Sequence, residues 1–464
     1  MSAPRSLFDT SSELASGDMM SRSEAQAFLE RIVKLSKADT IGAQLTGGYT
    51  GNIRFAANRI TTSGGVSNSQ LAVQSGYGPK HAVVTTSDFS PEGVERAVRQ
   101  SEAIAKLAPD DPENMPLLTP QHYHDVNAWF DSTANLAPAE RAAAARTAID
   151  AAKAAGDLAA AGFIVAGTSY NAIASNTGLY AYFPSTSANY QLTVRTSDGT
   201  GSGWAGADHP DWKQLDFKAV SDRAIQKARA SRNPVAIEPG RYTVVFEPTA
   251  VANLVQFVGN ALSARAADEG RSFFSRAGGK NKIGEKVVDE RVTILSDPFD
   301  PEVAGSPFTG EGLPTRRTVW IEGGVVKTLN YDRYWAQKKG VSPTASGGSL
   351  RMSGGSSTME EMIASTQRGL LVTRFWYLRP VDQRTILYTG LTRDGTFLIE
   401  NGKITRAVKN LRFNDSPVFM LNNLEALGTP VRVSASEDGG PGQAIMVPPI
   451  KVKDFNFTSL SDAV

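Results

Sequence analysis

Four histidines are the residues best suited to metal binding or acid–base chemistry, and their spacing forms no recognisable site. They are His81, His122, His124 and His209, and no two lie one helical turn apart, as in helical zinc-binding motifs. His122 and His124 could face the same side of a strand, but their proline-flanked connector favours solvent-exposed loop positions. Cysteine is absent, which excludes disulfides, thiolate ligands and a cysteine nucleophile. The residues alone therefore predict no metal site.

Other motifs that could carry out catalysis or bind a ligand have simpler structural explanations. We find neither a Gly-x-Ser-x-Gly elbow nor a helical Ser-x-x-Lys pair, and the glycine-rich run at 346–355 lacks the lysine of a phosphate-binding loop. Acidic residues at 297–302 and Glu311 could bind a hard cation, yet charge runs usually mark solvated loops. The aromatic run 375–377, followed by Arg379 and Arg384, could form a stacking platform, but cross-strand packing is the commoner explanation.

Composition indicates a folded protein without a strongly charged surface. The 464 residues exceed what one hydrophobic core usually holds, so two domains are expected. The 48 Lys and Arg against 47 Asp and Glu give a net charge of +1, which favours neither nucleic acid nor anionic lipid as a partner. The first 20 residues lack the apolar run of a secretory signal, and no segment is long enough to span a membrane. We therefore predict a cytoplasmic protein with a disordered N-terminus at 1–20.

The elements expected from periodicity and turn signals define an α+β fold. Amphipathic patterns predict helices after Ser21 and at 91–107, 138–155, 218–231 and 248–265. Short strands are expected between 43 and 85, separated by turns at Gly47-Gly48 and Gly64-Gly65. Further strands are expected at 161–166, 181–195 and 242–246, with hairpins at 321–325 and 399–403 and long loops at 268–286 and 341–358. The proline-rich linker near residue 235 divides an N-terminal α/β domain, 21–235, from a C-terminal β-rich domain, 236–464, with a mixed, curved sheet.

An ordered set of short motifs resembles the TldD/PmbA family over residues 25–460. The motifs are Asn58-Arg59-Ile60-Thr61, Phe246-Glu247-Pro248, Gly310-Glu311-Gly312 before Arg317-Thr318, and the run from Leu398 to Ile404. The resemblance implies an α/β N-terminal domain, a β-rich C-terminal domain, and a catalytic subunit paired with a TldE (PmbA)-type subunit around an enclosed chamber. Catalytic members are similar to one another in a His-Glu-x-x-x-His helix and a later cysteine that together hold zinc.

This chain departs from the catalytic pattern at each of those positions. The resemblance places Val255, Gln256 and Asn260 where the first His, the Glu and the second His would stand, and residues 433–439 contain no Cys. Valine has no lone pair, glutamine cannot act as a general base, and asparagine is a poor zinc ligand. Apolar residues around Val255 also recur at helical spacing, which predicts a packed helix. We therefore expect no catalytic residue, metal or cofactor in this chain, and zinc in a partner subunit.

These observations lead to three hypotheses. The first is a non-catalytic, TldE-like subunit of a heteromeric zinc metallopeptidase, whose TldD-like partner carries His-Glu-x-x-x-His and cleaves unfolded peptides. In this hypothesis an exposed sheet edge of the β-rich domain captures the peptide by strand addition. The second is a stand-alone peptide-binding or structural homodimer without peptidase activity. The third is a hydrolase that uses an unrelated site.

Overall fold

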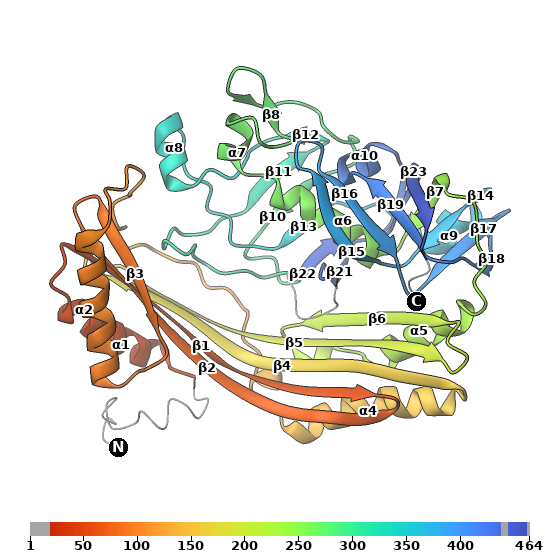
Figure 1. Ribbon diagram of the computed structural model, residues 1–464, viewed down its shortest axis with the longest axis horizontal. Coiled ribbons are helices and arrows are strands. Elements are labelled where there is room, and N and C mark those ends of the chain that lie inside the picture. Colours follow the sequence, from red (N-terminus) through yellow and green to blue (C-terminus); the bar gives the residue numbers. More distant parts are fainter. Residues whose placement is uncertain (1–18, 438–443, 462–464) are drawn as a thin grey trace.

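The N-terminal half is built on one long antiparallel sheet. The computed structural model describes residues 19–437 and 444–461, and Figure 1 shows this sheet stretched beneath the C-terminal half. Its strand order is β3-β2-β1-β4-β5-β6. The bounds are β1 Thr40–Ala56, β2 Arg59–Tyr77, β3 Lys80–Thr86, β4 Leu158–Ser175, β5 Tyr180–Thr196 and β6 Ser202–His209. We call it the long sheet.

Helices cover one face of the long sheet at both of its ends, because alternate residues along each strand are apolar. One core forms around α1 (Arg22–Leu35) and α2 (Pro91–Leu107) and contains Leu45 and Ala172, which are cross-strand neighbours. The other forms around α4 (Pro138–Ala154) and α5 (Phe217–Ala230). Short helices α3 (Asp131–Ala134) and η2 (Trp212–Gln214) complete this half.

The predicted helix starts are confirmed because their caps are local. Ser21 forms a capping box with Glu24, whose side chain accepts from the Ser21 N–H at 2.8 Å. Ser90 caps α2 through the N–H of Gly93 at 3.1 Å, with Pro91 as the first helical residue. The predicted disordered segment 1–20 lies outside the described residues except for its last two, of which Met20 is buried against α1.

The turns predicted at Gly47-Gly48 and Gly64-Gly65 are wrong, since both pairs lie inside strands β1 and β2. At Gly48 a Cβ atom would lie 2.0 Å from the Thr168 carbonyl oxygen, so glycine permits close approach of β1 and β4. The turn lies instead at Ala57 and Asn58, where both residues have positive φ. The short strands predicted between 43 and 85 are therefore one hairpin of two long strands, followed by β3.

The C-terminal half contains a mixed, curled sheet and a smaller mixed sheet around one large core. The first has the order β15-β16-β19-β23-β7-β14-β17-β18, with β20 paired to β23, and the second has the order β12-β11-β10-β13-β22-β21. Parallel pairs occur at β7 with β14 and at β13 with β22. This arrangement confirms the α+β fold with a mixed, curved second sheet.

The bounds of these elements follow chain order. The strands are β7 Gly240–Phe246, β8 Ser275–Arg276, β9 Lys280–Asn281, β10 Ile294–Ser296, β11 Thr318–Glu322, β12 Val325–Val326, β13 Leu350–Met352, β14 Arg368–Val372, β15 Phe375–Asp382, β16 Leu387–Thr392, β17 Thr396–Glu400, β18 Lys403–Ala407, β19 Leu411–Asp415, β20 Leu424–Leu427, β21 Val431–Ser434, β22 Ala444–Val447 and β23 Ile450–Leu460. The helices are α6 Pro248–Asn260, α7 Ala264–Asp268, α8 Arg333–Lys339, α9 Met359–Ala364 and α10 Pro417–Asn422.

Two predictions in this half need correction. The helix predicted at 248–265 ends at Asn260, because the chain then pairs with Asn330 and Ser263 caps a separate helix, α7. The loops predicted at 268–286 and 341–358 carry the β8–β9 hairpin and β13. Both hairpins predicted at glycine-containing turns are present as β11–β12 and β17–β18.

The connector between α2 and α4 ties the two halves together. Arg265 of α7 makes two hydrogen bonds to Glu113, at 2.7 and 2.8 Å. The Tyr123 hydroxyl donates to the Gly312 carbonyl at 2.8 Å, and Arg333 donates to the Pro116 carbonyl at 2.7 Å. Within residues 19–437 and 444–461, no helix has the length and apolar character needed to cross a membrane.

Candidate functional site

Helix α6 stands where the resemblance places the zinc-binding helix of catalytic relatives, and it packs as a core helix. Strand β7 leads into it through Glu247, with Pro248 at the first helical position. Val251, Leu254 and Val258 are buried in the main core of the C-terminal half. Such a continuous apolar stripe anchors the helix between the two sheets.

The three predicted site positions have different environments. Val255 is fully buried, at 0% exposure, so its side chain is part of the core. Gln256 is half-buried and its side-chain amide donates to the Ala435 carbonyl at 2.8 Å. Asn260, at the end of α6, is exposed and makes no hydrogen bond through its side chain to another described residue. Val255 therefore belongs to the core, whereas Gln256 and Asn260 line one cavity, and none of the three carries an imidazole, thiolate or carboxylate.

The late segment in which catalytic relatives carry cysteine lies beside α6. Ala435 follows β21, and its carbonyl oxygen accepts both from Gln256 and from the Asn253 amide at 3.0 Å. Asn253 also accepts the Phe375 N–H at 3.1 Å and is almost completely buried. The side-chain amides of Asn253 and Gln256 thus hold this segment against the helix. Asn253 and Ala435 are 182 residues apart in the sequence.

A cavity of about 540 Å³ opens at this junction. It is lined by neutral polar and apolar side chains, and none of the described lining residues is charged. They are Gln256, Gly259, Asn260, Leu262, Ser296, Trp320, Asn330, Ser346, Gly348, Ser349, Leu350, Ala435, Ser436, Ala444 and Ile445. Zinc requires imidazole, thiolate or carboxylate ligands, so the donors present do not fit the ion that the family resemblance implies.

The four histidines do not form one cluster. The His81 Nδ1 atom is 3.7 Å from a carboxylate oxygen of Asp111, while the rings of His122 and His124 meet edge to face at 5.6 Å between centroids. Burial lowers the pKa of His209, whose Nδ1 accepts the Asp211 N–H at 2.9 Å. Within the part of the chain that the structure describes, no three His, Cys, Asp or Glu side chains come together as metal ligands.

The acidic motifs considered from sequence form ion pairs within the chain. Asp300 accepts from Arg351, at 2.5 Å from Nε. Burial raises the pKa of this carboxyl, but the hydrogen bonds from Arg351 and from the Glu302 N–H, together with the charges of Arg351 and Arg432, lower it overall. Glu311 lies 3.1 Å from Arg333. The solvated-loop interpretation is therefore wrong for Asp300, since its side chain is only 10% exposed and its carboxylate is paired.

The aromatic run at the start of β15 is divided between core and surface. Phe375 is fully buried and packs 4.6 Å from Phe413 between ring centroids. Tyr377 is 44% exposed, and the guanidinium of Arg379 lies 4.4 Å from its ring. The guanidinium of Arg393 covers Trp376 at 4.2 Å. The rings of Trp376 and Tyr377, which could stack on a ligand, are therefore already covered by guanidinium groups.

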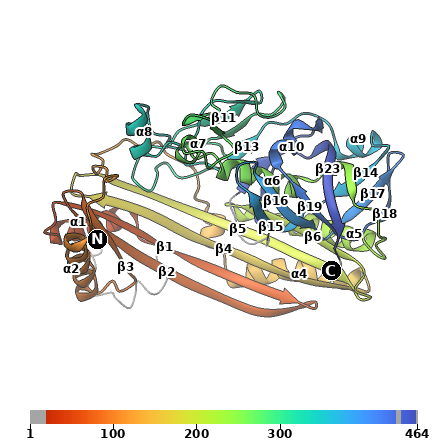
Figure 2. The ribbon, with the colours of Figure 1, turned by 45° about the horizontal axis from the view of Figure 1, so that its top comes forward.

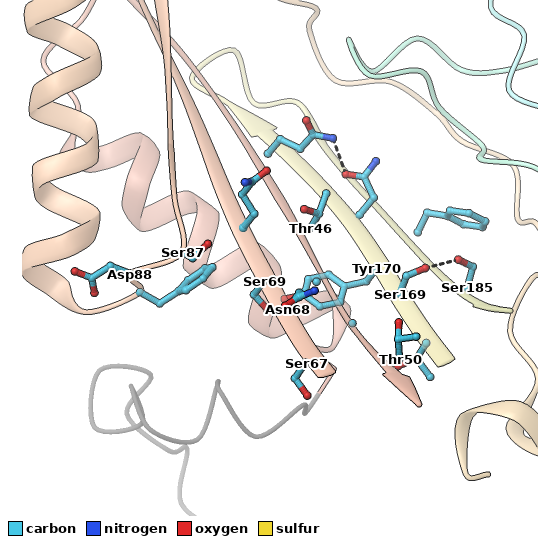
Figure 3. Close-up of a pocket in the computed structure, with 18 of the residues that line it drawn as sticks. Thr46, Thr50, Ser67, Asn68, Ser69, Ser87, Asp88, Ser169, Tyr170 and Ser185 are labelled. Carbon is cyan, nitrogen blue, oxygen red and sulfur yellow. Dashed lines mark hydrogen bonds between the residues drawn. The ribbon is translucent and has the colours of Figure 1, made fainter. Parts of the chain in front are cut away.

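A cavity of about 950 Å³ was not anticipated from the sequence (Figure 3). It lies over the middle of β1, β2 and β4, where hydroxyl and amide side chains such as Thr46, Asn68 and Ser169 gather. Gln44 donates to Asn171 at 2.9 Å, and Ser169 and Ser185 share a hydrogen bond of 2.9 Å. Asp88 is the charged residue among its described lining residues. The sequence feature that could have predicted this cavity is the row of uncharged polar residues in β1 and β2.

Both the second half of the long sheet and the C-terminal half match known domains. Residues 131–232 match the PmbA/TldA metallopeptidase central domain, and residues 239–459 match the PmbA/TldA metallopeptidase C-terminal domain. Together these matches cover more than half of the chain. The chain therefore belongs to the PmbA/TldD family of metallopeptidase homologues.

Individual relatives agree with this assignment. A metalloprotease of Methanothermobacter thermautotrophicus is 26% identical over 275 residues, which are 55% of this chain and 57% of the relative. A metalloprotease PmbA of Escherichia coli O157:H7 is 24% identical over 178 residues, covering 37% of this chain and 38% of the relative. The matched part of the chain thus spans about half the length, or less, of these curated relatives.

Solved structures share the whole fold. TldE from Thermococcus kodakarensis superposes with a TM-score of 0.82 at 19% identity, covering 94% of this chain and 99% of that chain. A putative modulator of DNA gyrase from Bacteroides thetaiotaomicron gives a TM-score of 0.80 at 21% identity, covering 95% of this chain and 100% of that chain. Because the sequence identities are this low, the structural similarity shows a shared fold alone.

Proposed function

We propose that this chain is a non-catalytic, TldE-like subunit of a heteromeric zinc metallopeptidase. The observation that carries the proposal is the replacement of the metal site by packing: Val255 is fully buried, and Gln256 holds the Ala435 carbonyl. A helix that is fastened in this way stabilises a subunit but offers no base or ligand for hydrolysis. The zinc, the general base and the bond cleavage belong to a homologous partner with His-Glu-x-x-x-His.

In this proposal the chain contributes a surface that holds unfolded peptide. The cavity over the long sheet is large and lined by hydroxyl and amide groups with little charge. Such groups both donate and accept hydrogen bonds, so they match the main chain of a peptide whatever its side chains. Strand addition to an exposed edge of the C-terminal sheet offers a second main-chain contact. We also propose that the chain acts in the cytoplasm, as predicted from the sequence.

The decisive experiment combines partner recovery with reconstitution. A tagged chain is isolated from its native cells, and stoichiometric partners are identified by mass spectrometry. We expect a homologue bearing His-Glu-x-x-x-His at near equal amount. The purified chain alone is expected to hold no stoichiometric zinc and to cleave no unfolded peptide, whereas the mixture with that homologue cleaves it in a chelator-sensitive way.

Each other outcome contradicts the proposal in a different manner. Recovery of the chain alone or as a homo-oligomer, with peptide binding but no cleavage, favours the stand-alone binding protein. Cleavage by the purified chain that survives chelator treatment favours a hydrolase with an unrelated site. A surface control, Glu290→Gln in the exposed pair with Lys286, is expected to leave partner recovery unaltered.

A further inference from the structure

A cavity of about 540 Å³ lies where the two halves of the chain meet. It shares no described lining residue with the cavity beside α6. Figure 2 shows α5 and β6 lying next to the part of the molecule that holds β17 and β18, as does Figure 1. We call it the junction cavity. Its lining comes from both halves and includes Thr200, Ser202, Ser231, Asp394, Thr396 and Lys409.

One buried hydroxyl group in the junction cavity has no hydrogen-bond partner. Thr396, the first residue of β17, is 2% exposed, and its Oγ1 atom bonds to no donor or acceptor among the described residues. Buried hydroxyl groups in native proteins are nearly always paired, because an unpaired one loses its bonds to water without replacement. Since Thr396 lines the cavity, a molecule bound there would supply the missing bond.

The other hydroxyl groups of the cavity have their protons engaged within the protein. Ser202 donates to an Asp394 carboxylate oxygen at 2.6 Å, and Ser231 donates to the Ser202 carbonyl at 2.8 Å. Thr200 donates to Asp198 at 3.0 Å. A hydroxyl group whose proton is engaged presents only lone pairs to a ligand. The cavity is therefore rich in acceptors, and a matching ligand must donate hydrogen bonds.

The charges around the cavity disfavour a charged ligand of either sign. A carboxylate or phosphate group would meet the buried carboxylate of Asp394. An ammonium group would meet Lys409 in the lining. It would also gain little from Asp394, because the guanidinium groups of Arg374 and Arg393 already lie 3.5 and 3.9 Å from that carboxylate. An ion of either sign would therefore lose its hydration without a compensating attraction.

We propose that the junction cavity binds an uncharged molecule rich in hydroxyl groups, a polyol or a monosaccharide. Its O–H groups supply the donors that the lining lacks, and one of them pairs with Thr396. Pro234 and Val408 supply apolar contacts for its C–H groups. The cavity volume of about 540 Å³ is typical of small-molecule sites. Because both halves contribute to the lining, the bound molecule stabilises their contact. The inference goes beyond the proposed peptidase role and does not rest on it.

Ligand-observed NMR titration of the full chain tests the proposed ligand class. The neutral probes are D-glucose, D-ribose and glycerol, and we expect at least one of them to bind with a Kd below about 10 mM. D-glucosamine and D-glucuronate are the matched charged probes, because each carries one charge on a glucose-like ring. Both are expected to bind at least about tenfold more weakly than the best neutral probe.

Thr396→Val tests the residue on which the inference depends. The change removes the hydroxyl group but keeps the shape of the side chain, so we expect at least about a tenfold loss of affinity for the best neutral probe. The urea midpoint of the free variant should not fall, since this hydroxyl makes no bond in the free protein. Thr405→Val, on the exposed part of β18 and outside the cavity, is the matched control and should bind the probe like the unchanged chain.

The probe should also stabilise the unchanged chain, because it binds only the folded state. We expect a saturating concentration of the best neutral probe to raise the urea midpoint of the unchanged chain and of Thr405→Val, but not that of Thr396→Val. The inference is overturned if none of the neutral probes binds, if a charged sugar binds more tightly than all of them, or if Thr396→Val loses no more affinity than Thr405→Val. None of these outcomes bears on partner recovery, which tests the peptidase proposal.

Discussion

The side-chain amide of Gln256 donates a 2.8 Å hydrogen bond to the main-chain carbonyl of Ala435. This bond joins the helix position where a peptidase relative would carry its general base to the segment where it would carry a cysteine ligand. The fold thus brings together the two segments that the resemblance assigns to a metal site, and in this chain a structural hydrogen bond joins them. The structural role that we assign to α6 can therefore be tested by replacing Gln256.

Replacing Gln256 by Leu tests whether this amide fastens the late segment. The Ala435 carbonyl keeps only the bond from Asn253, so we expect the free energy of unfolding to fall by about 1–2 kcal/mol. Urea denaturation followed by circular dichroism measures the change. Asn260→Leu, on the exposed end of the same helix, is the control and should change stability by less than about 0.5 kcal/mol. Equal effects of the two variants would contradict a fastening role.

Val255→His tests whether that position has become core. Introducing an imidazole at a fully buried site is expected to cost about 3 kcal/mol of unfolding free energy. The unfolded state binds a proton near pH 6.5 more readily than the buried ring, so the loss grows as the pH falls below that value. Asn260→His provides the exposed control. A stable Val255→His variant that binds zinc would contradict our assignment.

Asp289 should contribute acid-dependent stability. Its carboxylate accepts two hydrogen bonds from Arg291, at 2.8 and 2.9 Å, and this guanidinium lowers the pKa of Asp289 to about 2. The folded state therefore binds this proton less readily than the unfolded chain, whose carboxyl titrates near 3.8. The contribution is fully present above about pH 4 and is lost as the pH falls toward 2.

The measurement compares Asp289→Asn with the unchanged chain in urea between pH 2.5 and 7. We expect the variant to be less stable by up to about 2 kcal/mol at neutral pH, and the difference to shrink on the acid side. A difference that is constant with pH would show that the carboxylate charge contributes nothing. Glu290→Gln, which alters the exposed pair with Lys286, is the matched surface control.

Glu113→Gln tests the link between the connector and the C-terminal half. It weakens the two-bond contact with Arg265, whose pKa is raised by its hydrogen bonds to Glu113 and Glu269. We expect faster cleavage by limited proteolysis between residues 108 and 130, with little change in circular dichroism. The Glu290→Gln variant should be cleaved at the unchanged rate. Unaltered cleavage in Glu113→Gln would mean that Tyr123 and Arg333 hold the connector without it.

Features that depend on neighbouring residues were predictable from the sequence. The starts of α1 and α2 follow from Ser21 with Glu24 and from Ser90 with Pro91, which act within one helical turn. Features that depend on distant partners were not. Gly47-Gly48 was predicted as a turn because nothing nearby shows that β4 approaches closely at Thr168. The end of α6 depends likewise on Asn330, seventy residues further on.

The candidate site, too, was predictable from the sequence only in part. The identities of Val255, Gln256 and Asn260 came from the resemblance, and helical spacing explained why Val255 is buried. The contact between Gln256 and Ala435 spans 179 residues, so no local pattern predicts it. The cavity over the long sheet was missed because its polar residues come from strands that are far apart in sequence.

The strand order of the long sheet has a consequence during synthesis. The β1–β2 hairpin is complete at residue 77, but the inner neighbour of β1 is β4, and Asn58 meets Ala160 across 102 residues. At 5–20 residues per second, the ribosome needs roughly 5–20 s to deliver that stretch. The nascent hairpin therefore emerges with both of its margins unpaired, and a chaperone that shields it until β4 arrives would prevent premature association between neighbouring nascent chains.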